Sequence, residues 1–327
     1  MSDLSKLART IKGIEFPHPL MVGGGVFKLA EELRAVAKSE VIPEWGSIET
    51  DSSSGNGGDD YHAAYTDMGD NLKHTRNRRG IPNPGMAYVE RESRDIISMY
   101  ADEGKVVGLN VSGKAGNGRS SVTDLLELVK RGLDCGFRWI TANGACPNKA
   151  DQPILCDDED AVSEFFDRAD AEIGSTDAIL AWKVSNGMRR FTLAHNKACV
   201  VKSEAFTAII TGNTVPNTLD FNRDGRPTVL TQKDNSMWAG LAGPAIHPIA
   251  LGHTMFCAQD MPAGKIVIGA GGVEGWPEVR NFFRAEATLV QVVSAYLEAD
   301  KYSMAGGKRR GAEFVSNTLV GLADSME

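Results

Sequence analysis

Phe137-Arg138-Trp139-Ile140-Thr141 and the loop Asn143-Gly144-Ala145-Cys146-Pro147-Asn148 form the stretch on which the interpretation of the chain depends. The apolar run predicts a buried strand, and the loop after it places one cysteine between two asparagines. A thiol in such a loop can act as a base or a nucleophile. Asparagine amides can hold a planar polar ring, because each offers two donors and an acceptor. The alternative is an inert cysteine, since free cysteines are often buried.

Short apolar runs of this kind recur along the 327 residues, and helical patterns separate them. Strands that alternate with helices favour a parallel sheet, and eight such units predict a (β/α)₈ barrel, also called a TIM barrel. A doubly wound open sheet is the alternative. The expected strands cover residues 20–22, 44–50, 105–111, 137–141, 178–184, 205–210, 265–269 and 288–293. The expected helices include one from residue 26 to about 38 and, after the last strand, a single helix that ends near residue 322.

No linker divides the chain, so we expect one domain over residues 1–327. Two polar stretches, near 51–85 and 215–238, interrupt the alternation of strands and helices. Long irregular loops inside a compact domain are uncommon and usually functional. We therefore expect both stretches to be irregular insertions on the active face of the barrel, and we expect residues 240–246 to open the next helix.

Charge and cysteine usage exclude several classes of protein. The formal net charge of -8 and the pI of about 5.4 argue against nucleic acid as the main partner. The five cysteines are odd in number and include no CxxC pair, so neither a disulfide framework nor a zinc site is expected. The sequence begins without a signal-peptide pattern and has no apolar run of about 18 residues. We expect no membrane helix and a cytoplasmic location.

The predicted strand ends carry glycines, polar side chains and one lysine, and active sites of such barrels lie at these ends. Gly271-Gly272 after the seventh strand and Val293-Ser294 after the eighth occupy the usual phosphate position of the fold, where backbone N–H groups bind a dianion. Gly243 can add a third arm. Lys183 lies late in an apolar strand, and a flavin ring would be a suitable partner because reduction places negative charge near N1 and O2. The alternatives are tight turns at the glycines and a lysine that reaches the surface.

With these motifs in place, the chain resembles the dihydroorotate dehydrogenases, an FMN-dependent (β/α)₈ family, and most of all the class 1 members. The resemblance runs from about Pro19 to Glu298. The Asn143–Asn148 loop is similar to the family's Asn-x-Ser-Cys-Pro-Asn motif, in which membrane-bound class 2 members carry serine for cysteine. Four further segments match family motifs in order and spacing: 80–85, 213–214, 239–248 and 268–273.

The resemblance implies a role for each site residue. Cys146 is the base that takes a proton from substrate C5, while a hydride passes from C6 to flavin N5. The implied substrate-binding residues are Asn83, Asn143, Asn148, Asn213, Thr214 and, by alignment, Asp51. The implied FMN-binding residues are Gly23, Gly24, Ser52, Asn143, Lys183, Gly243, Gly271, Gly272, Val293 and Ser294. It also implies a homodimer, with fumarate or an NAD-linked partner subunit as electron acceptor.

One departure from the family divides the functional hypotheses. Where the family has a lysine followed by a serine, the alignment gives Asp51-Ser52, and a carboxylate there would repel the substrate's own carboxylate. Arg78 or Arg79 could supply the missing cation. The first hypothesis is interconversion of dihydroorotate and orotate; the second is another activated C–C bond, in a neutral or cationic ring. A flavin-binding protein without turnover is the third, and Cys146 with its asparagines argues against it.

Overall fold

Eight parallel strands close into a barrel in the computed structural model, which describes residues 3–65, 71–116, 118–146, 154–303 and 310–326. The prediction of a (β/α)₈ barrel is confirmed, and the open doubly wound sheet is wrong. In order around the barrel the strands are β3 (Leu20–Phe27), β4 (Pro43–Ile48), β8 (Gly108–Val111), β9 (Trp139–Asn143), β10 (Ile179–Lys183), β11 (Phe206–Ile210), β15 (Ile266–Ala270) and β16 (Leu289–Val292).

The barrel strands are continuous apolar runs because both of their faces are covered. Every residue of β9 and β10 is buried, one face against the barrel interior and the other against helices. Their parallel register pairs Trp139 with Ile179 and Asn143 with Lys183. The register therefore brings two predicted site residues to the same carboxyl end of the barrel.

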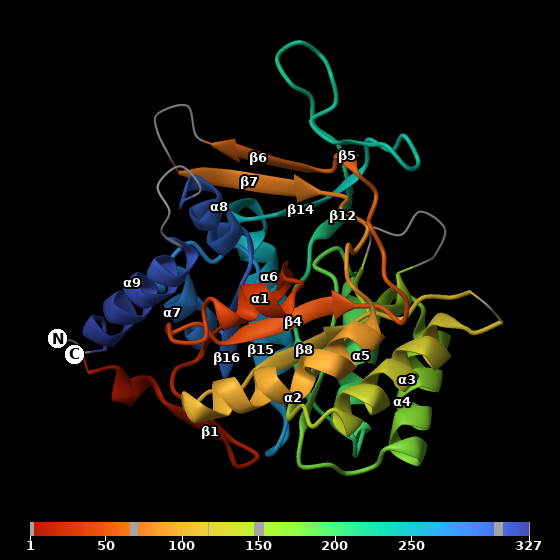
Figure 1. Cartoon of the computed structure of the whole chain (residues 1–327), viewed down its shortest axis with the longest axis vertical. Coiled ribbons are helices and arrows are strands. Elements are labelled where there is room, and N and C mark those ends of the chain that lie inside the picture. Colours follow the sequence, from red (N-terminus) through yellow and green to blue (C-terminus); the bar gives the residue numbers. More distant parts are fainter. Residues whose placement is uncertain (1–2, 66–70, 117, 147–153, 304–309, 327) are drawn as a thin grey trace.

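Helices surround the barrel, with α2 to α5 along one side and α7 to α9 along another (Figure 1). The first helix is shorter than expected because β3 continues to Phe27, and the single expected C-terminal helix is two helices, α8 and α9. No helix in the described part of the chain is both long and apolar enough to cross a membrane. The helices are α1 (Ala30–Arg34), α2 (Met86–Asp102), α3 (Ser121–Asp134), α4 (Glu159–Glu172), α5 (Arg190–Lys202), α6 (His247–Ala258), α7 (Trp276–Arg284), α8 (Ser294–Ser303) and α9 (Arg310–Asp324), with 3₁₀ turns Leu4–Leu7, Leu155–Asp157 and Pro244–Ile246.

A hairpin closes the amino end of the barrel. Its strands, β1 (Arg9–Ile11) and β2 (Ile14–Phe16), precede the first barrel strand, and Phe16 packs edge-on against Trp139 with ring centroids 5.5 Å apart. Both rings belong to an apolar cluster that fills the barrel's lower interior. The carboxyl end of the barrel remains available for a site.

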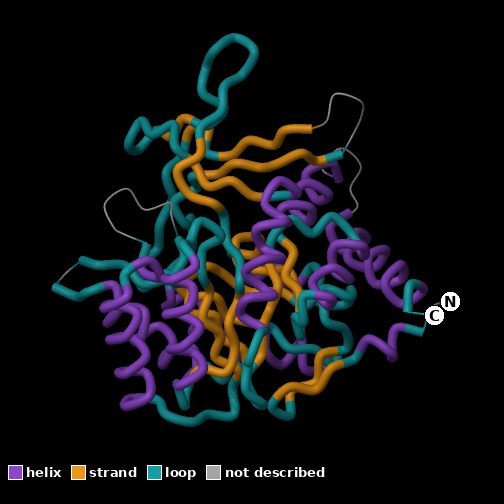
Figure 2. The backbone as a smooth tube through the Cα atoms, turned by 180° about the vertical axis from the view of Figure 1, so that it is seen from behind, coloured by secondary structure: helices purple, strands orange, loops and turns teal. Residues whose placement is uncertain are grey.

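We expected the two insertions to be irregular, but both contain strands. They contribute β6 (Tyr61–Tyr65), β7 (Leu72–Asn77) and β12 (Val215–Thr218), which form a four-stranded sheet with β14 (Ala239–Ala242) in the order β12-β14-β7-β6. A smaller sheet pairs β5 (Gly58–Asp59) with β13 (Leu230–Thr231). The larger sheet, here called the cover sheet, stands over the carboxyl end of the barrel (Figures 1 and 2). The start of the expected helix at 240–246 is a strand instead.

Long-range pairing explains why the cover sheet escaped the sequence analysis. β7 pairs with β14 more than 160 residues further on, for example Arg76 with Leu241, and polar strands of this kind have no apolar periodicity of their own. The buried guanidinium of Arg76 donates to the hydroxyls of Thr228 (2.5 Å) and Thr218 (3.3 Å). Arg76 belongs to the basic cluster Arg76-Asn77-Arg78-Arg79, and it is thus part of the sheet's interior.

Candidate active site

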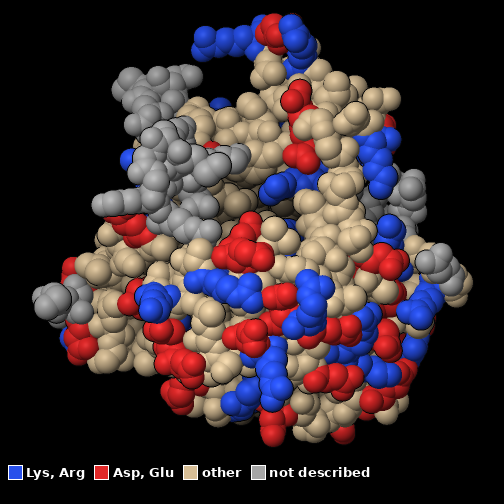
Figure 3. Space-filling view, viewed as in Figure 1, with Lys and Arg blue, Asp and Glu red and all other residues tan. Residues whose placement is uncertain are grey.

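A cavity of about 1190 Å³, its open mouth included, lies between the barrel's carboxyl end and the cover sheet. Figure 3 shows the hollow between the two parts, with basic side chains beside it. Both the barrel strand ends and the cover sheet line this cavity, which makes it the candidate site for a cofactor and a small substrate. Eleven of the predicted site residues line it: Gly24, Asn143, Cys146, Lys183, Asn213, Thr214, Gly243, Gly271, Gly272, Val293 and Ser294.

Two predicted asparagines hold the backbone next to Cys146. The amide N–H of Ala145 donates to Oδ1 of Asn143 (3.1 Å), and the carbonyl of the same residue accepts from Nδ2 of Asn213 (2.8 Å). Ala145 is fully buried, whereas Cys146 is partly exposed toward the cavity. The loop therefore presents the thiol from an anchored backbone.

Hydrogen bonds continue from this loop to the centre of the barrel. Nδ2 of Asn143 donates to the hydroxyl of Ser47 (3.1 Å), which donates to Oδ1 of Asn110 (2.6 Å), whose Nδ2 donates to Oε2 of Glu44 (3.0 Å). The series of hydrogen bonds begins at the backbone N–H of Ala145 and ends at the carboxylate of Glu44, and the donor lies on the same side of every link. The two ends therefore require the same orientation of the Asn143 and Asn110 amides, which fixes how the Asn143 amide is placed at the cavity.

Three cations line the cavity, and no Asp or Glu is among the described residues of its lining. Burial lowers the pKa of Lys183, and the negative charges of Glu44 and the Cys146 thiolate oppose that change. Burial also lowers the pKa of Lys28 to about 7, with a further contribution from the nearby charge of Arg79. The Lys28 ammonium donates to the carbonyl of Ser47 at 3.4 Å. The cavity is therefore suited to anions.

Replacing Lys28 by methionine should stabilise the protein most at low pH. Between about pH 7, the pKa in the folded state, and 10.5, its ordinary value, the unfolded chain holds the Lys28 proton more tightly. Wild-type stability therefore rises with pH across this window, by up to about 5 kcal/mol from this residue. Urea unfolding at a series of pH values should show Lys28→Met losing that slope, whereas the exposed-site variant Lys38→Met keeps it. Parallel pH curves for wild type and Lys28→Met would contradict the assignment.

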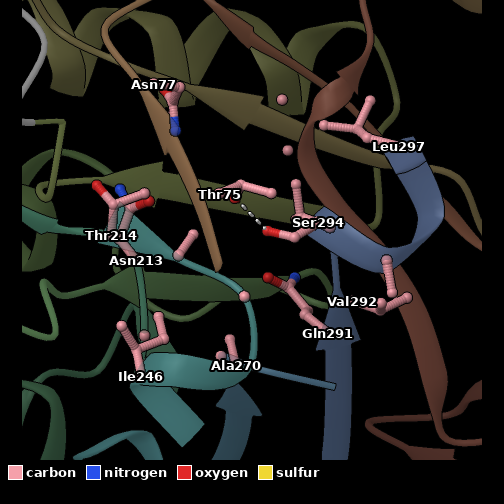
Figure 4. Close-up of a pocket in the computed structure, with 18 of the residues that line it drawn as sticks. Thr75, Asn77, Asn213, Thr214, Ile246, Ala270, Gln291, Val292, Ser294 and Leu297 are labelled. Atoms are coloured by element: carbon pink, nitrogen blue, oxygen red, sulfur yellow. Dashed lines mark hydrogen bonds between the residues drawn. The ribbon is translucent and has the colours of Figure 1, made fainter. Parts of the chain in front are cut away.

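Glycines form a narrow cradle at the ends of β15 and β14. A Cβ on Gly272, where φ is +69°, would lie 2.7 Å from Cβ of His247 and 2.9 Å from the carbonyl of Gly243. The helix α8 begins beside this cradle at Ser294, whose hydroxyl is 3.1 Å from that of Thr75 on the cover sheet (Figure 4). Backbone N–H groups at a helix start and in glycine turns bind phosphate, so these residues fit a phosphate group.

The structure places Asp51 and Ser52 outside the cavity, which corrects the alignment that gave them substrate and flavin contacts. Both are exposed and line a separate surface depression with Lys114. β4 ends at Ile48, so residues 51 and 52 lie beyond the barrel rim. Ser47 takes the place in the cavity that was expected for Ser52.

Two other predicted residues, Asn83 and Gly23, do not line the cavity, and the placement of a third is not described. Asn83 is buried and uses its amide locally, accepting from the N–H groups of Glu49 (3.2 Å) and Gly85 (2.9 Å) and donating to the carbonyl of Ile81 (2.9 Å). Gly23 lies one residue before the lining, and a Cβ there would be 2.8 Å from Oε1 of Gln291. Asn148 falls outside the described residues.

Lys28 is the main residue that the sequence analysis missed. It was assigned to a helix from residue 26 onward, but β3 extends to Phe27 and carries it to the strand's carboxyl end. Its position just after the Gly23–Gly25 run was the available signal. The cover sheet adds Tyr61, Thr75 and Asn77 to the lining, and Figure 4 shows the last two. No pattern in the sequence pointed to these residues, because they reach the cavity only through strand pairing.

Comparison with known proteins gives one consistent family. A family model described as dihydroorotate dehydrogenase matches residues 6–306. A dihydroorotate dehydrogenase (quinone) from Erythrobacter litoralis is 28% identical over 295 residues, 90% of this chain and 79% of that protein. A dihydroorotate dehydrogenase B (NAD(+)) catalytic subunit from Anoxybacillus flavithermus is 24% identical over 293 residues, 89% of this chain and 86% of that protein.

The same fold is present in a solved structure. A dihydroorotate dehydrogenase from Eimeria tenella, in complex with ferulenol, matches with a TM-score of 0.75 at 17% identity. The match covers 99% of this chain and 85% of that one. At 17% identity this similarity shows that the two proteins share a fold.

Proposed function

Because the chain belongs to the dihydroorotate dehydrogenase family, whose members are oxidoreductases, we propose that it is an FMN-dependent enzyme that interconverts dihydroorotate and orotate. The observation that carries the proposal is the cationic cavity lining, with Lys28 and Arg79 near the Cys146 thiol. A substrate carboxylate needs a cation of this kind. Asp51, the residue that favoured a neutral or cationic ring, lies outside the cavity, so the anionic substrate is preferred.

The residues present fit FMN. The glycine cradle and the start of α8 suit its phosphate, and Lys183 faces the same cavity from β10. Gly24 lines the cavity, and no side chain fits at this position, since a Cβ there would meet the Asn110 amide at 2.6 Å. When bound, FMN supplies the acceptor for the substrate hydride.

Each side chain then has a defined task. Asn143 and Asn213, which line the cavity, orient the substrate ring through the donors and acceptors that their contacts with Ser47 and Ala145 leave over. Lys28 and Arg79 hold its carboxylate. The Cys146 thiolate would take the proton from substrate C5, and FMN, when bound, would accept the hydride from C6, so that the C5–C6 bond becomes double. Lys183 would supply a positive charge beside the cofactor, which would favour the reduced form.

The electron acceptor is proposed from the relatives. Because the Anoxybacillus relative is named a catalytic subunit of an NAD(+) enzyme, we propose an NAD-linked partner subunit, with fumarate as the alternative acceptor. The homodimer implied by the family resemblance stays a prediction, as does membership of class 1. The relatives carry both quinone and NAD(+) names.

The direct test is anaerobic addition of dihydroorotate to the purified protein loaded with FMN. We expect the visible flavin band to bleach rapidly, and orotate to restore it after photoreduction. A yellow protein that dihydroorotate does not bleach would move the substrate to a relative without the carboxylate. A protein that cannot be loaded with FMN would contradict the flavoenzyme proposal as a whole.

A further inference from the structure

A carboxylate lies at the centre of the barrel, below the cavity. Glu44 on β4 is fully buried, in a barrel whose interior also holds an apolar cluster. Burying a charge among apolar groups is unfavourable unless it is paired and hydrogen-bonded. The position of Glu44 therefore calls for an explanation.

Every group that faces this carboxylate is a donor. Oε2 accepts from the N–H of Gly24 (2.8 Å) and from Asn110 (3.0 Å). Oε1 accepts from the indole of Trp139 (3.0 Å), the hydroxyl of Thr141 (2.5 Å) and the amide of Gln291 (2.8 Å). An ionised carboxylate has acceptor sites and no donor, so this surrounding suits the charged form.

The matching cation is Lys183. It is 4% exposed, and within the described chain it has neither a hydrogen-bond acceptor nor a salt bridge for its ammonium group. Glu44 is the first of the two negative groups that favour its protonated form, ahead of Cys146. Glu44 stands on β4 and Lys183 on β10, with β8 and β9 between them. Thr141 on β9 donates to Glu44 and is paired in register with Ala181, so Lys183 lies two residues beyond that level on the same face of β10.

We propose that Glu44 is the internal counter-ion of the site: its carboxylate balances Lys183 and thereby sets the reduction potential of the bound flavin. Glu44 touches neither substrate nor cofactor in this assignment, so it is a positioning residue. The inference rests on the proposed function for its redox consequence. The interaction between the two buried charges, Glu44 and Lys183, does not depend on a bound cofactor.

Glu44→Gln removes the charge and loses one hydrogen bond. Its amide nitrogen can replace Oε1 toward the Thr141 hydroxyl and the Gln291 amide, which can turn, since Oε1 of Gln291 has no donor among the described residues. The indole N–H of Trp139 is a donor only and loses its acceptor in this variant. The carbonyl then keeps the contacts of Oε2, including the fixed N–H of Gly24. Reduced flavin carries negative charge near N1 and O2, so losing a nearby anion should favour it.

The measurement is the midpoint potential of bound FMN, titrated against a reference dye. We expect Glu44→Gln to raise the potential by about 30 mV or more, a tenfold change in the two-electron equilibrium constant. Thr141→Val, which removes a neutral donor from the same carboxylate, should change that constant by less than about threefold. An unchanged or lowered potential in Glu44→Gln would overturn the proposal.

A stability cycle tests the pairing without cofactor. Glu44→Gln and Lys183→Met should each lower the thermal midpoint of the FMN-free chain, and the double variant should lose less than the sum of the two. If Glu44→Gln alone does not fold, recovery of a cooperative transition in the double variant supports the pairing. Additive losses, or no recovery, would overturn it. A wild type that binds no FMN contradicts the proposed function, while this cycle still decides about Glu44.

Discussion

Replacing Cys146 by alanine should abolish reduction of the flavin by dihydroorotate while FMN stays bound. The thiol lines the cavity on a loop whose backbone is anchored by Asn143 and Asn213, so its removal takes away the proposed base without changing the phosphate cradle. General-base catalysis contributes about 10²–10⁴-fold, and we expect a loss of at least this size. Anaerobic stopped-flow measurement of flavin bleaching gives the rate directly.

Two matched variants distinguish the loss of the base from a general effect of removing a cysteine. Cys199 is partly exposed like Cys146 but lies on α5, outside the cavity lining, and burial raises the pKa of its thiol. Cys199→Ala should bleach at the wild-type rate. Cys146→Ser keeps an ionisable oxygen and should retain part of the activity that alanine loses. If Cys146→Ala bleaches within a few-fold of wild type, the thiol is not the base.

Arg79→Met should weaken orotate binding by about 10- to 100-fold, because a hydrogen bond to a charged group contributes about 1.5–3 kcal/mol. Arg79 lines the cavity beside Lys28, and no described carboxylate forms a salt bridge with it. Its loss leaves one cation for the substrate carboxylate instead of two. The change of the flavin spectrum on titration with orotate measures the dissociation constant.

The neighbouring arginine provides the control. Arg78 points away from the cavity and forms a salt bridge with Asp234 at 2.6 Å. Arg78→Met removes the same charge one residue away, and its orotate affinity should stay within about threefold of wild type. Equal losses in both variants would mean that the effect is the general field of the basic cluster, and a role for Arg79 as carboxylate ligand would be contradicted.

Sequence alone was sufficient where the information is local. The apolar runs of the eight barrel strands predicted the fold, because a strand covered on both faces must be apolar throughout. The motifs at the ends of those strands gave Cys146, Asn143, Asn213, Lys183 and the glycine cradle. Strand ends of a parallel barrel meet at one rim whatever the details of the loops, so these predictions needed only the strand order.

Only the tertiary structure showed which cations line the cavity and which strands cover it. A strand end misplaced by a few residues made Asp51 a site residue and hid Lys28 in a helix, and only the observed ends of β3 and β4 corrected this. The cover sheet depends on pairing between β7 and β14, far apart in the chain. The donors around Glu44 come from four other strands. Such contacts have no local periodicity, because they exist only once the barrel has closed.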